Sequence, residues 1–156
     1  MIKLFKRRTI ALSASFAIVS MLVLSCRSSD DGGSTTNGSN YKITVTLNNV
    51  SAEDFVSVVT VGAGKSDVYT NWKVNGKVRS GESTISLGKN DFTGSTKTYV
   101  IETSEPITTM TAGAQIINYG ADLPMSYKIE KNGKTVVDEN LTLKGDGTDF
   151  SKNYSF

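Results

Sequence analysis

The sequence has no histidine and a single cysteine among its 156 residues. A disulfide within the chain is therefore impossible, and zinc sites built from histidine and cysteine are excluded. The same absences exclude Ser-His-Asp and Cys-His nucleophilic centres. The chain also lacks a cluster of lysine and arginine beyond residue 25, so it has no electrostatic footprint for nucleic acid. We expect no cofactor and no nucleic-acid partner.

The first 25 residues have the composition of a secretory signal. Lys3, Lys6, Arg7 and Arg8 form a basic start, and an apolar stretch follows from Ile10 to Leu24. A transmembrane helix needs roughly 20 apolar residues, and this stretch is shorter. A membrane-spanning anchor is the alternative reading. All 15 acidic residues lie beyond the leader, which carries four of the 17 basic ones, so the chain after it is near −2.

Cys26 directly follows the run from Leu22 to Ser25. Together with the leader, this run resembles the lipobox of bacterial lipoproteins. The resemblance implies cleavage before Cys26 and acyl chains, such as palmitate, on that residue. Each buried methylene contributes roughly 0.8 kcal/mol, and two or three chains hold a protein at the membrane permanently. An unmodified free thiol is the alternative.

Residues 26–40 contain no aliphatic or aromatic side chain. We expect a flexible tether with a root-mean-square reach of roughly 20 Å. Its residues Ser28, Ser29, Asp30 and Asp31 resemble the acidic export signal of surface-exposed lipoproteins of the Bacteroidetes type. That resemblance implies an outer-membrane lipoprotein displayed at the cell surface. The alternative is an ordinary solvated linker.

Residues 41–156 are long enough for one domain with its own core. Apolar residues alternate with polar ones at period two, which is typical of half-buried strands. The clearest examples are Ile43, Val45 and Leu47, and later Met125, Tyr127 and Ile129. Asn75-Gly76 and Asn132-Gly133 each separate two such runs, which predicts tight hairpins.

The remaining segments predict further strands and few helical residues. Residues 55–61 are apolar on both sides, which favours a central strand. We expect Phe55, in this segment, and Trp72, in the next strand, to be large residues of the core. We expect strands at 68–74 and 114–119, a short helical turn at 51–54 capped by Ser51, and a plain turn at 89–91. About eight or nine strands, with turns every 8–12 residues or so, predict an all-β fold, a single antiparallel β-sandwich that is immunoglobulin-like or related. A closed barrel is the alternative.

Aromatic and polar residues suggest a candidate ligand rim in this domain. Trp72, Tyr69 and Tyr119 could present flat surfaces to sugar rings, with Asn118 and Asp122 beside Tyr119. Large aromatics are more often core or hairpin anchors, and we favour that role for Trp72.

Carboxylates provide the other candidate sites. Residues 145–149 carry Asp146 and Asp149, but calcium takes six to eight oxygens, so a Gly/Asp turn is the favoured interpretation. The adjacent pairs Glu53/Asp54 and Asp138/Glu139 could suggest a glycosidase. Neighbours on a strand point to opposite faces, so we do not expect either pair to be catalytic.

These observations predict three parts, namely a signal peptide at 1–25, a tether at 26–40 and a β-sandwich at 41–156. We expect a lipid-anchored surface protein that is not an enzyme and binds a glycan, host or envelope partner. A small carboxylate-dependent hydrolase and a structural envelope accessory are the alternatives.

Overall fold

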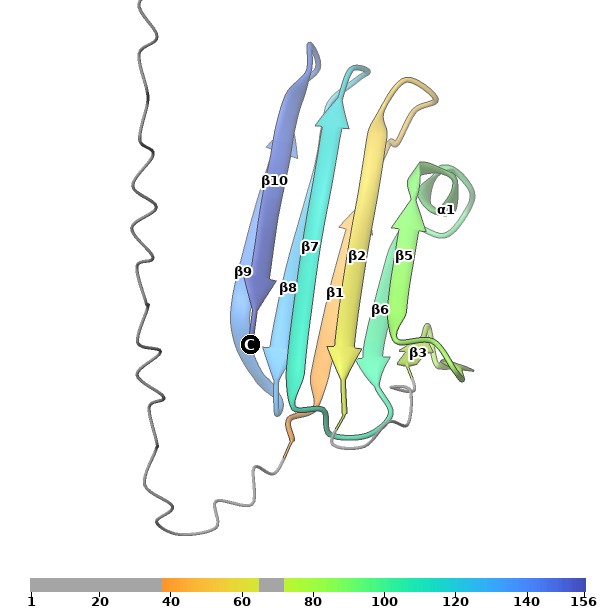
Figure 1. Ribbon diagram of the computed structural model, residues 1–156. Coiled ribbons are helices and arrows are strands. Elements are labelled where there is room, and N and C mark those ends of the chain that lie inside the picture. Colours follow the sequence, from red (N-terminus) through yellow and green to blue (C-terminus); the bar gives the residue numbers. More distant parts are fainter. Residues whose placement is uncertain (1–37, 65–71) are drawn as a thin grey trace, which may run out of the picture. The chain divides into compact units, whose positions relative to one another are not determined.

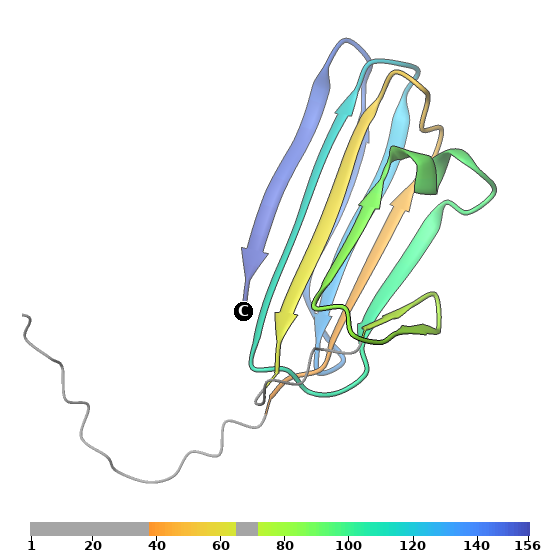
Figure 2. The ribbon, with the colours of Figure 1, turned by 45° about the vertical axis from the view of Figure 1, so that its right-hand side comes forward.

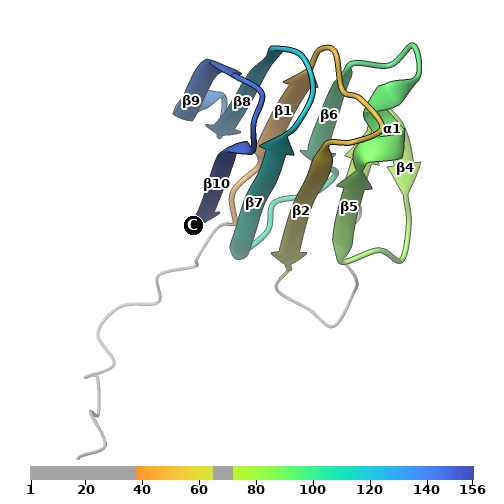
Figure 3. The ribbon, with the colours of Figure 1, turned by 90° about the horizontal axis from the view of Figure 1, so that it is seen from above.

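The computed structural model describes residues 38–64 and 72–156. In Figure 1 the described chain forms two packed sheets of antiparallel strands, and Figure 3 shows the two layers from above. The prediction of an all-β sandwich is confirmed, and the barrel alternative is not. The strands are β1 (Tyr41–Leu47), β2 (Phe55–Ala63), β3 (Trp72–Val74), β4 (Lys77–Arg79), β5 (Thr84–Gly88), β6 (Thr98–Thr103), β7 (Thr109–Asn118), β8 (Leu123–Lys131), β9 (Lys134–Leu143) and β10 (Thr148–Ser155).

One sheet has six strands in the order β4-β3-β6-β1-β8-β9, and the other has four in the order β10-β7-β2-β5. The chain joins the sandwich at Ser39, which pairs with Ile107. We call the end that holds this pair basal. The opposite end is apical, and it carries the connections 48–54, 119–122 and 144–147 (Figures 1 and 2).

The core lies between the sheets and follows the period-two pattern. Ile43, Val45 and Leu47 of β1 and Tyr127 and Ile129 of β8 have no exposed surface, as the alternation predicts. Both Asn-Gly pairs form hairpin turns with positive φ at both residues, at 49° and 77° for Asn75-Gly76 and at 50° and 77° for Asn132-Gly133. Such turns match the twist of the strands that they join.

Several local predictions were wrong. Residues 89–93 form a short helix, α1 (Lys89–Thr93), because the Asp91 carboxylate accepts the Gly88 N–H at 2.7 Å and Phe92 is buried against Tyr99. Residues 51–54 form no helical turn, because tertiary hydrogen bonds hold Asp54 instead. The strand predicted at 114–119 runs from Thr109 to Asn118.

Strand β2 occupies the predicted central position, between β7 and β5. Its burial nevertheless alternates, because only one side of the sheet is covered by the other layer. Phe55 is 45% exposed and Val61 is 41% exposed, so the prediction that both sides are buried was wrong, as was Phe55 as a core anchor. Within the described ranges, no helix is long and apolar enough to cross a membrane.

Candidate functional site

The apical connections contain several of the sequence-predicted site residues, but most of them hold the loops together. Asn118 is fully buried; its side-chain amide donates to the carbonyls of Ala121 and Leu143, at 2.9 and 2.8 Å. Asp122 is exposed and forms an ion pair with Lys144. Tyr119, at 54% exposed, is the large hydrophobic residue that this loop offers to solvent. Tyr119 is therefore exposed, as a rim residue must be, whereas Asn118 is buried and holds the loop through its hydrogen bonds.

Asp54 is the main junction of the apical end, and it is 3% exposed. Its carboxylate accepts the backbone N–H groups of Ser51, Tyr119 and Gly120 at 2.7, 2.9 and 3.2 Å. Burial raises the pKa of Asp54, but these hydrogen bonds and one from the Ser51 hydroxyl outweigh it, so the pKa lies below its usual value. Asp54 is therefore an ionised brace between two loops, and its oxygens are already occupied.

Residues 145–147 lie in the expected turn between β9 and β10. Asp146 and Gly147 have φ of 64° and 81°, and the Thr148 hydroxyl donates to the Gly145 carbonyl at 3.0 Å. Asp149 lies on β10, opposite Ile117 of β7. Among residues 38–64 and 72–156, no three carboxylate, thiol or imidazole side chains gather as metal ligands would.

Trp72 is fully buried, and its indole ring lies against Gly62, where an added Cβ would come within 2.7 Å of the ring. Trp72 is therefore a core residue, as the favoured interpretation predicts. The alternative that it forms part of an exposed ligand rim is wrong, because β3 turns the ring inward. Tyr69 lies outside the described residues, as do Cys26 and the segment Ser28–Asp31.

The adjacent carboxylates do not converge. Glu53 is exposed beside the buried Asp54, and Asp138 and Glu139 alternate across β9. Asp138 accepts from Asn140, whereas Glu139 accepts the Tyr154 hydroxyl at 2.9 Å. Burial and this carboxylate raise the pKa of Tyr154 to about 12. The arrangement agrees with the expectation that neither pair is a catalytic couple.

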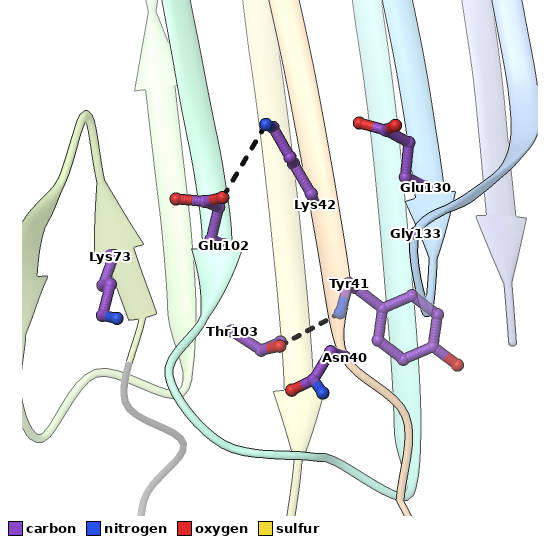
Figure 4. A pocket seen from close by; sticks show the side chains of 8 residues that line it. All are labelled: Asn40, Tyr41, Lys42, Lys73, Glu102, Thr103, Glu130 and Gly133. Atoms are coloured by element: carbon purple, nitrogen blue, oxygen red, sulfur yellow. Dashed lines mark hydrogen bonds and ion pairs between the residues drawn. The ribbon is translucent and has the colours of Figure 1, made fainter.

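A groove of about 340 Å³ lies on the outer face of the six-stranded sheet toward the basal end (Figure 4). Its charged residues form an alternating row across four strands, in which Lys73 faces Glu102, Glu102 faces Lys42, and Lys42 faces Glu130. The Lys42 and Glu102 side chains lie 3.9 Å apart, and the Thr103 hydroxyl accepts the Tyr41 N–H at 3.0 Å. The Lys42–Glu102 ion pair and the Thr103–Tyr41 hydrogen bond thus stabilise the sheet at this groove, which is the usual use of cross-strand pairs.

The outer faces of the two sheets differ sharply in charge. The outward positions of the six-stranded sheet include the charged residues Lys42, Lys73, Glu102, Lys128, Glu130 and Asp138. In the four-stranded sheet, strand alternation places one charged residue outward, Asp149, and Lys152 on the edge strand β10 is exposed beside this face. We call this outer face of β10, β7, β2 and β5 the neutral face. Its outward residues are Phe55, Ser57, Val59, Val61, Ala63, Thr84, Ser86, Gly88, Thr109, Thr111, Gly113, Gln115, Ile117, Asp149, Ser151, Asn153 and Ser155.

The neutral face has a shallow hollow of about 360 Å³ at its centre, over β2, β7 and β10. Gly113 forms the floor: a Cβ there would lie 3.0 Å from the Asn153 side-chain oxygen and 3.2 Å from the Lys152 carbonyl. Within the described chain, the side chains of Ser57, Gln115 and Asn153, which line the hollow, have no hydrogen-bond partner. Their donors and acceptors are therefore available to a ligand.

The neutral face could not be recognised from the sequence alone. Its residues come from four strands spread over positions 55–155, so they meet only once the strand register is known. The one local signal was the run of serine, threonine, asparagine and glutamine at alternate positions of 109–117 and 149–155, interrupted at Asp149 and by apolar residues.

Comparison with known proteins identifies the fold alone. No family model matches the sequence, and no curated protein matches it. A solved structure described as the calcium-bound form of a protein from Parabacteroides distasonis has 17% identity and a TM-score of 0.59, over 80% of this chain and 96% of that one. A DUF4425 family protein from Bacteroides ovatus has 15% identity and a TM-score of 0.56, over 77% and 95%. A domain of unknown function, DUF4425, from Bacteroides vulgatus has 18% identity and a TM-score of 0.53, over 78% and 94%. These sources agree with a Bacteroidetes-type protein.

Proposed function

We propose that the protein is a lipid-anchored, non-catalytic binding module of the cell surface and that the neutral face is its binding surface. The charge asymmetry between the two outer faces carries this proposal. Solvated sheet surfaces normally bear charged residues, as the six-stranded sheet does, whereas charged residues are depleted in the core of binding interfaces. A face that holds one charged residue among its outward positions has the composition of a surface that is covered in use.

Non-catalytic action is supported by the carboxylates. Asp54 is held by three backbone donors, and Glu139 is hydrogen-bonded to Tyr154. A glycosidase needs two carboxyl groups that face one substrate at roughly 5–10 Å. The adjacent pairs of this chain point to different surroundings, which favours binding over hydrolysis.

Anchoring rests on the sequence. The leader, the Leu22–Cys26 run and the acidic residues after it support acylation of Cys26 and display at the surface. Display is tested by adding protease to intact cells, which should remove the domain. Replacing both Asp30 and Asp31 with alanine should reduce that accessibility. Equal accessibility of the two forms would show that the run is only a linker.

Occupation of the neutral face is tested with a photo-crosslinking amino acid on intact cells. Placed at Gln115, at the centre of the neutral face, the crosslinker should form adducts with a partner. Placed at Thr44, on the outer face of β1, it is the matched control. Equal labelling from the two positions would contradict the proposal.

Whether binding depends on calcium is a second test, because the similar structure from Parabacteroides distasonis was solved in a calcium-bound form. In this chain the nearest candidate is the turn with Asp146 and Asp149, which supplies too few oxygens by itself. We propose binding that needs no metal ion. Equal crosslinking from Gln115 with and without a chelator is the expected result.

A further inference from the structure

We infer that the ligand of the neutral face is an uncharged polysaccharide chain that lies along the strands. This inference rests on the proposed function and names the chemical class of the ligand. It is argued from the charge, the exposed aromatic residues and the free polar side chains of that face.

The charge of the face selects an uncharged ligand. Asp149 and Lys152 are the charged residues at the face, so most charged groups of a carboxylate, sulfate or ammonium-bearing chain would lose water there without gaining an opposite charge, which is unfavourable. Asp149, beside Ile117, would also repel an anion at the apical end. A chain of hydroxyl groups meets no such penalty.

The apical end of the face offers two aromatic rings. Phe55 is 45% exposed and lies opposite Ile117, and Tyr119, at 54% exposed, follows two residues later. Tyr119 lies just beyond the end of β7, in the β7–β8 connection, so both aromatic residues are at the apical end of the domain. The Tyr119 ring also lies close to Gly147, where an added Cβ would come within 3.3 Å of it. A sugar ring has an apolar C–H face, which packs on such exposed aromatic surface.

The centre of the face offers hydrogen bonds. Gln115 has Ser57 on one side and Ser151 on the other, and Asn153 lies one step further along β10, opposite Gly113. Side-chain amides carry both donors and acceptors, as sugar hydroxyls do. Since Gly113 leaves the hollow open, the chain can approach the backbone there. Ser57, Gln115 and Ser151 form a row across the strands, and Phe55 lies two residues from Ser57 along β2. An extended ligand that meets both the aromatic and the polar groups therefore runs along the strands.

A protein partner is the competing occupant, because Val59 and Val61 add apolar surface to the face. The polar groups favour the glycan: a protein interface core is more apolar, with aromatic residues and methionine enriched and serine depleted. The experiment below separates the two.

The test uses the full-length protein purified in detergent and a panel of polysaccharides. The panel holds uncharged glucans, mannans and galactans together with chains that bear uronate or sulfate groups. We expect binding to at least one uncharged chain, with an affinity that stays within about twofold between 50 and 500 mM salt, because no ion pair is involved. Binding confined to charged chains, or weakened by salt, would overturn the inference.

Variants then locate the ligand. Phe55→Ala, Tyr119→Ala and Gln115→Glu should each weaken binding by about tenfold, since each removes a contact or buries a charge. Val78→Ala, at an exposed position on the six-stranded sheet, and Thr44→Glu are the matched controls and should change nothing. All five positions are partly or fully solvent-exposed, and a thermal melt confirms that each variant is folded. Unchanged binding by the first three variants would place the ligand elsewhere and overturn the inference.

The claim that the neutral face binds a partner and the claim that this partner is an uncharged polysaccharide can be refuted separately. If no uncharged polysaccharide binds, but the crosslinker at Gln115 captures a protein or a second copy of this chain, the glycan inference is wrong and the binding face stands. If the crosslinker at Gln115 labels no more than that at Thr44, the binding face itself is wrong.

Discussion

Removal of the Asp54 carboxylate should destabilise the connections at the apical end of the sandwich. Asp54 accepts two backbone N–H groups from the β7–β8 connection, 65 and 66 residues away in sequence, and one from Ser51. Hydrogen bonds to a charged group contribute roughly 1.5–3 kcal/mol each, and they do not add fully. Water can reach part of this loop, so we expect Asp54→Ala to lower the free energy of unfolding by about 3 kcal/mol. That corresponds to a fall in Tm of roughly 10 °C for a domain of this size.

The pH dependence of this effect follows from the lowered pKa of Asp54. A carboxylate whose pKa is lower in the folded state stabilises the protein fully above its unfolded value, here 3.8, and loses that effect as pH falls through the folded pKa. The difference between wild type and Asp54→Ala should therefore be complete at pH 7 and should shrink below pH 3.8. The sign is fixed, because the unfolded state binds the proton more tightly.

The assay is urea unfolding of a fragment that spans residues 35–156, the compact unit of the chain. Asp54→Asn is the conservative variant: it keeps one acceptor oxygen but turns an NH₂ group toward backbone donors, so a smaller loss is expected. Glu53→Ala, at the exposed neighbour, is the control and should stay within about 0.5 kcal/mol of wild type. If Asp54→Ala also changed the free energy of unfolding by less than about 0.5 kcal/mol at pH 7, the claim that its carboxylate stabilises the apical connections would be wrong.

Three further results are expected. Trp72→Ala should destabilise the same fragment by about 3–5 kcal/mol, because Trp72 is fully buried, whereas Phe55→Ala should leave Tm nearly unchanged; equal melting of Trp72→Ala and wild type would contradict the core assignment. A chelator should not alter Tm, and a fall in Tm would make the turn at Asp146 a metal site. Cys26→Ser should abolish lipid labelling and stop processing of the leader, and normal labelling of that variant would exclude the lipobox.

The sequence predicted those parts of the fold that depend on local chemistry. The Asn75-Gly76 and Asn132-Gly133 turns follow from residues that tolerate positive φ, and the inward faces of β1 and β8 follow from strict alternation. Residues 55–61 were misread because an apolar run does not reveal which side of a sheet is covered. Alternation along β2 puts Phe55, Val59 and Val61 on one face, but only the packing of the two sheets shows that this face is uncovered.

The candidate site could be predicted only in part. The exposure of Tyr119 was predicted from the turn signals around it, and the structure agrees. Asn118 and Asp54 were not identified as braces, because their partners lie in other connections and come together only through folding. The helix at 89–93 was missed for a similar reason: it is stabilised by burial of Phe92, which the local sequence does not reveal.

The central claim is that the neutral face holds the ligand, and mapping of backbone amide signals by NMR tests it most directly. The protein would be titrated with the polysaccharide that binds best, and amide shifts would be followed residue by residue. The account predicts shifts that cluster in β2, β7 and β10, around Ser57, Gly113 and Ser151, with few in β1 and β8. Shifts confined to the Lys42–Glu102 groove or to the turn at Asp146 would contradict it.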